Sequence, residues 1–150
     1  MNRNSIVIEN TRIPFSNFSG RPDRYHPDGG KRSFSIVLDP KIAQDLSDRG
    51  WNVRTLRPRD EGEEPTPYVS VNVRFDVRPP KVFMITDSGK KVALNEATIG
   101  ELDYADIESV DVALNPYEYQ PGRVSVYLDE LYAKLAPDPL GDKYRDMDLD

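Results

Sequence analysis

Residues 12–38 read RIPFSNFSGRPDRYHPDGGKRSFSIVL, and they set the plan of the chain. Both ends are apolar and strand-like, and the glycine and proline residues between them favour a loop over a helix. Cations and aromatic rings are interleaved along this stretch, namely Phe15, Phe18, Arg21, Arg24, Tyr25, Lys31, Arg32 and Phe34. Phosphates need positive charge and unstacked bases need flat apolar partners, so the pattern is typical of a surface for single-stranded nucleic acid. The alternative is an irregular loop with its rings in the core and its arginines in solvent.

The charge of the chain is unevenly distributed. A net charge of −6 argues against a nucleic-acid partner, but the distribution of charge matters more than its sum. Residues 1–60 carry a balance of +4, residues 61–136 a balance of −7 and residues 137–150 a balance of −3. The stretch at 12–38 therefore lies in the only net-basic part of an acidic chain. Such a chain can bind a polyanion through one local basic groove, although long-range steering is weaker.

Composition narrows the class of protein. A length of 150 residues fits one domain with a sizeable core. The chain has no apolar run of the length that a membrane-spanning helix needs, and its N-terminus has no apolar signal core. The absence of cysteine excludes disulfides, thiol catalysis and cysteine metal sites. We therefore expect a soluble cytoplasmic protein, in the cytoplasm of the host cell if the protein is viral.

The hydrophobic pattern predicts many strands and one short helix. Alternation is clearest at 68–75, where the core face is Val69, Val71, Val73 and Phe75 and the outer face is Tyr68, Ser70, Asn72 and Arg74. Further strands are predicted at 5–12, 33–38, 51–56, 81–86, 91–94, 108–119 and 123–135. Asp39 and Pro40 begin a helix over 41–49 that ends at Gly50, and Trp51 is predicted to pack against it. Residues 95–107 are expected to hold one or two short helical turns.

Strands joined mainly by hairpins, with few helices, indicate an all-β barrel or sandwich. A small five-stranded antiparallel barrel with an extra hairpin fits the pattern, and this is the plan of the OB-fold. We expect one domain over residues 1–136, followed by a flexible acidic tail over residues 137–150.

The tail combines acidic residues with isolated apolar anchors. This pattern is typical of a peptide that docks on partner proteins and competes with DNA for a basic groove. The residues predicted to bind partners are Tyr144, Asp146, Asp148, Leu149 and Asp150. A disordered, solvated terminus is the alternative, and both interpretations can hold together.

Catalytic chemistry has little support in the sequence. His26 is the single histidine, so a histidine metal cluster is excluded. Residues 29–33 lack the spacing of a phosphate-binding loop and precede a strand instead of a helix. The enzymatic alternative is a metal-dependent nuclease that uses Asp103, Asp106, Glu108 and Asp111. We otherwise expect no catalytic residue, no metal and no cofactor.

Several short segments carry a resemblance to a known family. They are RIPF at 12–15 with NF at 17–18, GKRSFSI at 30–36, GWNVR at 50–54, YVSV at 68–71, VALNPY at 112–117 and VSVYL at 124–128. In their order and spacing, over most of the chain, these segments resemble the phage-encoded single-stranded-DNA-binding proteins of OB-fold type. The resemblance implies a β-barrel, DNA binding without sequence specificity, no cofactor and an acidic C-terminal tail.

The sequence therefore predicts a protein that coats and protects single-stranded DNA during phage replication or recombination. The predicted DNA-binding residues are Arg12, Phe15, Phe18, Arg21, Arg24, Tyr25, Lys31, Arg32, Arg54, Tyr68 and Arg74. Phe34 is assigned mainly to the core because it shares parity with Ile36 and Leu38. Replication or recombination proteins are the partners expected at the tail, and a homo-oligomer is left open. A third hypothesis, besides the coating protein and the nuclease, is a non-enzymatic phage β-protein. It would contact a basic partner through the acidic surface of residues 61–136.

Overall fold

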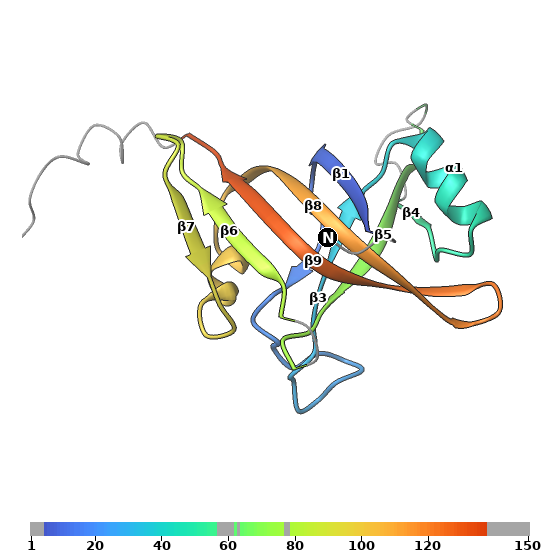
Figure 1. Cartoon of the computed structure of the whole chain (residues 1–150), viewed down its shortest axis with the longest axis horizontal. Helices are drawn as coiled ribbons and strands as arrows, with labels where there is room; N and C mark the ends of the chain where they lie inside the picture. The colour runs from blue at the N-terminus through green and yellow to red at the C-terminus, as the bar shows by residue number, and fades with distance from the viewer. Residues whose placement is uncertain (1–4, 57–61, 63, 77–78, 138–150) are drawn as a thin grey trace, which may run out of the picture.

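The computed structural model describes residues 5–56, 62, 64–76 and 79–137, and these form a single curved sheet with one α-helix (Figure 1). The strands are β1 (Ile6–Thr11), β2 (Ser16–Asn17), β3 (Arg32–Val37), β4 (Arg54–Leu56), β5 (Thr66–Val73), β6 (Lys81–Ile85), β7 (Lys91–Leu94), β8 (Ile107–Gln120) and β9 (Arg123–Leu135). The helix α1 spans Pro40–Asp48, and a 3-10 helix, η1, spans Ile99–Asp103. Nine described strands exceed the seven or eight that the sequence predicts.

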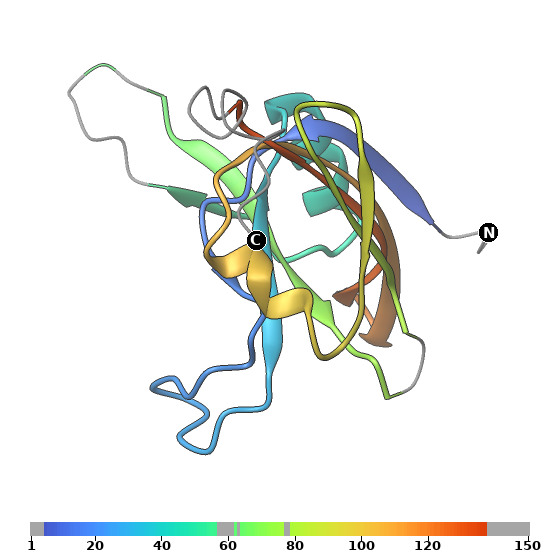
Figure 2. The same ribbon diagram turned by 90° about the vertical axis from the view of Figure 1, so that its left-hand side faces the viewer.

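The main path through the sheet runs in the order β1-β8-β9-β5-β3-β2. This path curls round so that β3 approaches the end of β1 (Figure 2). The Val37 N–H of β3 donates to the carbonyl of Arg12, the residue directly after β1, at 3.0 Å. The predicted fold class, a β-rich OB-fold with one short helix, is confirmed. One detail differs, since β5 and β6 both pair in parallel with β9. The small antiparallel barrel that the sequence predicts therefore includes two parallel pairings.

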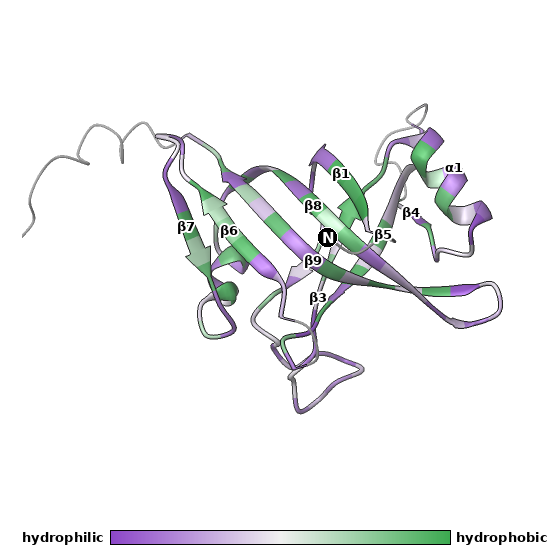
Figure 3. Cartoon of the chain, viewed as in Figure 1, coloured by the Kyte–Doolittle hydropathy of each residue, from purple (hydrophilic) through white to green (hydrophobic). Residues whose placement is uncertain are grey.

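Alternating side chains of β3 and β5 form much of the core. Phe34 lies opposite Val71 and Ile36 opposite Val69, and all four are at most 2% exposed. The same alternation appears as bands of opposite hydropathy along β8 and β9 (Figure 3). Val69, Val71 and Val73 are buried as predicted, but Phe75 lies beyond the end of β5 and is only partly buried.

The start of α1 has the predicted N-cap, because the Asp39 carboxylate accepts the Lys41 N–H at 2.9 Å.

The C-terminal end of α1 supports the β8–β9 hairpin. Gly50 ends the helix with φ +94°, and a Cβ at this position would lie 2.7 Å from the Gly122 carbonyl oxygen. The Val124 N–H donates to the Gly50 carbonyl at 3.2 Å. Only glycine therefore allows the helix end to approach the hairpin turn this closely.

The β6–β7 hairpin is attached to the far half of β9. Phe83 of β6 stacks on Tyr132 of β9 with ring centroids 5.1 Å apart, and the Lys91 Nζ of β7 lies 4.1 Å from the centre of the Phe83 ring. The lysine thus covers one of the stacked rings. This extra hairpin was predicted, with its turn at residues 87–90.

The structure bears on the membrane prediction and on the predicted acidic tail only through the residues that it describes. Within the part of the chain that the structure describes, no helix is long and apolar enough to cross a membrane. Residues 138–150 of the predicted acidic tail, which include the predicted partner-binding residues Tyr144, Asp146, Asp148, Leu149 and Asp150, lie outside the described residues.

Candidate nucleic-acid interface

A pair of aromatic rings, one exposed and one half-buried, lies on the outer face of the sheet. Ser16 pairs with Phe34 in the β2–β3 register, which places the preceding residue, Phe15, opposite Ser35. The Ser35 N–H donates to the Phe15 carbonyl at 2.8 Å. The Phe15 ring meets the Tyr68 ring of β5 edge-on, with centroids 5.8 Å apart. Phe15 remains 54% exposed, so this pair offers aromatic surface to a ligand.

A cation flanks this aromatic pair. Arg54 of β4 lies directly opposite Tyr68, and directly opposed residues share one face of a sheet. Arg54 is exposed, and Ser35 between the two rings is only 5% exposed. The small serine side chain therefore leaves room for the rings to approach each other across β3. We name Phe15, Tyr68 and Arg54 the aromatic platform.

A polar groove adjoins the platform along β5. It has a volume of about 540 Å³ and is lined by Gly30, Lys31, Arg32, Asn72, Val73, Arg74, Phe75, Asp76, Glu96, Ser125 and Tyr127. Asn72 and Tyr127 are paired where β5 meets β9, and the Asn72 amide donates to the Val126 carbonyl at 3.2 Å. Outer-face positions of β5 therefore lead directly from Tyr68 into the groove.

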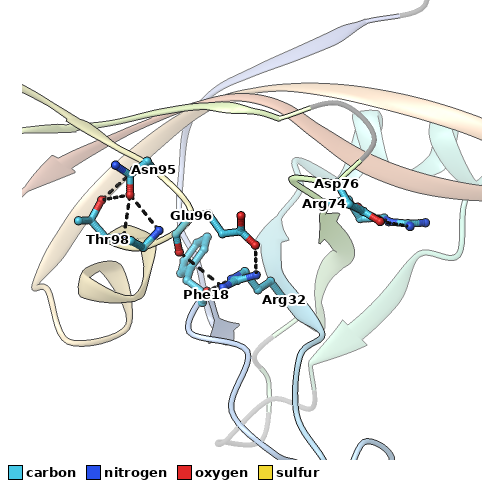
Figure 4. Close-up of polar contacts among 8 residues, drawn as sticks. Phe18, Arg32, Arg74, Asp76, Asn95, Glu96 and Thr98 are labelled. Carbon is cyan, nitrogen blue, oxygen red and sulfur yellow. Dashed lines mark hydrogen bonds and ion pairs between the residues drawn. The ribbon is translucent and has the colours of Figure 1, made fainter.

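Two arginines in the groove are already paired with carboxylates (Figure 4). Arg74 holds Asp76 through two contacts, Nη2 to Oδ2 at 2.7 Å and Nε to Oδ1 at 3.1 Å. The hydrogen bond with Asp76 raises the pKa of Arg74, so its charge is fixed. Arg32 lies 3.6 Å from Glu96 and also donates from Nε to the Phe18 carbonyl at 3.0 Å. The groove thus contains two carboxylates, Asp76 and Glu96, that were not among the predicted site residues.

The loop between β2 and β3 is anchored at its base by Asp103 of η1. Its carboxylate accepts the Phe18 N–H at 2.8 Å, the Ser19 N–H at 2.9 Å and the Ser19 hydroxyl at 2.5 Å. Partial burial opposes ionisation of Asp103, but the hydrogen bonds from Ser19 and from the Phe18 N–H outweigh it and lower its pKa. Asp103 therefore stays ionised and fixes the point where the chain leaves β2.

Phe18 is the clear correction among the predicted stacking residues. It is fully buried and stacks on Phe34, with ring centroids 5.0 Å apart. A ring without exposed surface offers no face to a base, so the expectation that Phe18 contacts DNA is wrong for this structure. Phe34 is buried as predicted.

Five of the seven predicted cations, those outside the loop between β2 and β3 or at its end, divide into three groups. Arg54, Lys31 and Arg74 lie on the platform or in the groove. Arg32 lines the groove but is held by Phe18 and Glu96, so it serves chiefly to join the β2–β3 loop to residues 95–98. Arg12 lies elsewhere, in a cavity of about 740 Å³ that Asp103, Asp106 and Glu108 also line.

The remaining predicted residues lie on the loop between β2 and β3. Arg21 is held at the loop base, where its N–H donates to the Asn17 side-chain oxygen at 2.9 Å. Arg24 and Tyr25 lie in the exposed part of the loop, and Tyr25 is 81% exposed. The structure therefore keeps Tyr25 apart from Phe15 and Tyr68 but leaves its ring accessible.

Three tyrosines on the β8–β9 hairpin were missed. Tyr117 lies opposite Ser125, and Tyr127 lies opposite Asn72, so these residues share the outer face with the groove. Tyr117 is 60% exposed and Tyr119 is 51% exposed. The alternation of Tyr117, Glu118 and Tyr119 was an available signal, because two exposed aromatic residues at a spacing of two lie on one face of a strand.

Of the carboxylates of the nuclease alternative, Asp103, Asp106 and Glu108 line the cavity that contains Arg12, and Asp111 does not. Asp103 holds the loop base, Asp111 accepts the Asn10 N–H at 2.8 Å, and Glu108 lies 3.9 Å from Lys134. No three His, Cys, Asp or Glu side chains within the described ranges are arranged to hold a metal ion.

Comparison with known proteins identifies the family. The family model described as "Putative phage ssDNA-binding domain" matches residues 1–149. The chain belongs to this phage single-stranded-DNA-binding family. The predicted resemblance is thereby confirmed, and binding of single-stranded DNA is the function of this domain. No curated protein matches the sequence.

Solved structures agree with the fold. The C-terminally truncated single-stranded-DNA-binding protein from bacteriophage Enc34 has a TM-score of 0.52 and 15% identity, covering 91% of this chain and 88% of that chain. The Enc34 protein in complex with ssDNA has a TM-score of 0.49 and 15% identity, covering 92% and 90% of the two chains. The single-stranded-DNA-binding protein gp2.5 of bacteriophage T7 has a TM-score of 0.43 and 15% identity, covering 96% and 94%. At this identity the first of these likenesses supports the fold of the domain alone.

Proposed function

We propose that this protein coats single-stranded DNA during phage replication or recombination, and that the strand crosses the aromatic platform and the adjoining groove. The observation that carries the proposal is the contact of the exposed Phe15 ring with the half-buried Tyr68 ring beside Arg54. OB-folds use the face of their second and third strands and the loops beside it to bind oligonucleotides. In this chain those strands are β3 and β5: Tyr68 of the platform is on β5, Arg54 is on β4, which pairs with β5, and Phe15 precedes β2, which pairs with β3. Bases would stack on the rings while Arg54, Lys31 and Arg74 approach phosphates.

The loop and the hairpin on either side of this face complete the proposed interface. The loop contributes Tyr25 and Arg24, and the hairpin contributes Tyr117 and Tyr119. Every base has a flat apolar face, so aromatic contacts of this kind bind single strands without reading their sequence. The proposal therefore includes binding that is independent of sequence.

A titration of labelled oligo-dT in EDTA tests the proposal. We expect micromolar or tighter binding that weakens steeply as salt is added, because binding to phosphates releases counterions. A blunt duplex of the same length is the control, since its paired bases cannot stack on the platform. Equal affinity for the two DNAs, or binding of neither at low salt, contradicts the proposal.

The protein is proposed to act without chemistry of its own. Retention of an intact strand after incubation with magnesium or manganese is the expected result. If the strand is degraded with magnesium or manganese but stays intact in EDTA, the nuclease alternative is favoured instead.

The acidic tail is proposed to dock on replication or recombination proteins and to compete with DNA. We propose the division into a binding domain at 1–136 and a tail at 137–150 on the charge pattern alone. Deletion of residues 137–150 is expected to strengthen oligo-dT binding, and unchanged affinity removes the tail from that competition. Light scattering of the full chain tests whether it forms a homo-oligomer.

A further inference from the structure

The charge of the groove is unusual for a site that binds a polyanion. Its lining contains three cations, Lys31, Arg32 and Arg74, together with two carboxylates, Asp76 and Glu96, so its net charge is only +1. Grooves that track single strands are generally lined by unopposed positive charge. The two carboxylates therefore reduce the attraction that the groove would otherwise exert on phosphates.

Both carboxylates lie at the rim and remain accessible. The side chains of Asp76 and Glu96 are each 65% exposed, while their partners Arg74 and Arg32 are 52% and 22% exposed. A nucleic acid that enters the groove thus meets negative charge as well as the arginines. Exposed ion pairs of this kind contribute little to folding stability, so stability alone does not account for them.

The two forms of DNA respond differently to such a rim. Duplex DNA carries phosphates on both sides of a rigid helix, at a charge density of about one per 1.7 Å of axis. It cannot avoid placing phosphates near a carboxylate, and like charges brought together at an interface are penalised. A flexible single strand can turn its bases toward the rim and its phosphates toward Lys31, and it gains stacking on Phe15 and Tyr68 as well.

We infer that Asp76 and Glu96 are selectivity residues, which disfavour duplex DNA at the groove more than they disfavour a single strand. This role rests on the proposed function, because it assigns the groove to DNA. It is a case of specificity built by repulsion of the wrong ligand, in addition to attraction of the right one. The pairing of each carboxylate with an arginine holds the negative charge at the rim.

The test is the double variant Asp76→Asn and Glu96→Gln. Both amides keep an oxygen that accepts from the arginine, so the contacts at Arg74 and Arg32 have isosteric replacements. The matched control is Asp45→Asn with Glu108→Gln, which removes two exposed, ion-paired carboxylates outside the groove, whose side chains are 61% and 50% exposed. Thermal unfolding of both double variants checks that each is folded before DNA is added.

Binding is measured by fluorescence anisotropy at low salt, with oligo-dT and a blunt duplex of equal length. We expect duplex affinity to rise about tenfold and oligo-dT affinity about threefold or less, relative to the control variant. An equal rise for both DNAs, or no rise beyond the control, overturns the selectivity role. Failure of the wild-type protein to bind oligo-dT would contradict the proposed function itself, so the two failures are distinguishable.

Discussion

Phe15 and Phe18 lie three residues apart in one segment, yet they belong to opposite faces of the sheet. Phe15 is 54% exposed and meets Tyr68 on the outer face, whereas Phe18 is fully buried against Phe34. Side chains alternate between the faces of a strand, so an odd separation places the two rings on opposite sides. The same residue type is therefore a candidate ligand contact at one position and part of the core at the other.

Asp103 and Arg32 maintain this difference where the chain leaves β2. Asp103 accepts the Phe18 N–H, and Arg32 donates to the Phe18 carbonyl. Both polar groups of the Phe18 backbone are thus satisfied by distant residues while its ring is buried. The platform depends on this anchoring, because the orientation of Phe15 follows from the register that β2 takes on β3.

The largest effect is expected on the buried side. Phe18→Ala should lower the free energy of unfolding by about 3–5 kcal/mol, because it removes a large core side chain and leaves a cavity. Urea denaturation followed by circular dichroism measures this loss. Phe15→Ala is the control, for which a change within about 0.5 kcal/mol is expected because its ring is largely exposed. A comparable loss of unfolding free energy in both variants would contradict the assignment of Phe18 to the core and of Phe15 to the surface.

The next effect is expected on the exposed side. Phe15→Ala and Tyr68→Ala should each weaken oligo-dT binding by about 1–3 kcal/mol, which is roughly 5- to 150-fold, because each removes a stacking surface. Anisotropy titrations at fixed salt measure the change. Tyr104→Ala is the matched control, since Tyr104 is 78% exposed but does not line the groove. Wild-type affinity in both platform variants would move the DNA path away from the platform.

A smaller effect is expected at Asp103, which holds the base of the loop between β2 and β3. Asp103→Asn should cost about 1–2 kcal/mol of stability at neutral pH, because the carboxylate accepts hydrogen bonds from the Phe18 and Ser19 N–H groups. The folded-state pKa of Asp103 lies below its unfolded value. The stabilisation is therefore complete above about pH 3.9 and is lost as the pH falls through the folded-state pKa. Urea denaturation of both proteins across this range should show the difference narrowing in acid, and a constant difference would contradict it.

The smallest effect is expected for the cation of the platform. Arg54→Ala should reduce the slope of log K against log salt by about 0.7 for oligo-dT, which corresponds to one phosphate contact on a single strand. Arg49→Ala is the control, because Arg49 is exposed directly after the end of α1 and is paired with Asp45. An unchanged slope in Arg54→Ala would show that this cation does not meet a phosphate.

Local sequence patterns predicted most elements of the fold because their signals are short-range. The helix follows from Asp39, Pro40 and Gly50, and the β8–β9 turn follows from Pro121 and Gly122. Parity places Phe15 and Phe18 on opposite faces, but which ring is buried was not predictable, because that depends on the register of β2 on β3 across a long loop. The pairing of Arg32 with Glu96 was missed for a related reason, since 64 residues separate the two.

By itself, the sequence determined the strands, the helix caps, the basic first part of the chain and the resemblance to the phage family. These depend on periodicity, capping and composition, which act over a few residues or over the whole chain. Only the tertiary structure decided which aromatic rings are exposed and which arginines are paired. Those properties depend on the register between β2, β3 and β5 and on loops that meet from distant positions. A basic, aromatic stretch was visible from the start, but only the fold reduced it to one platform and one groove.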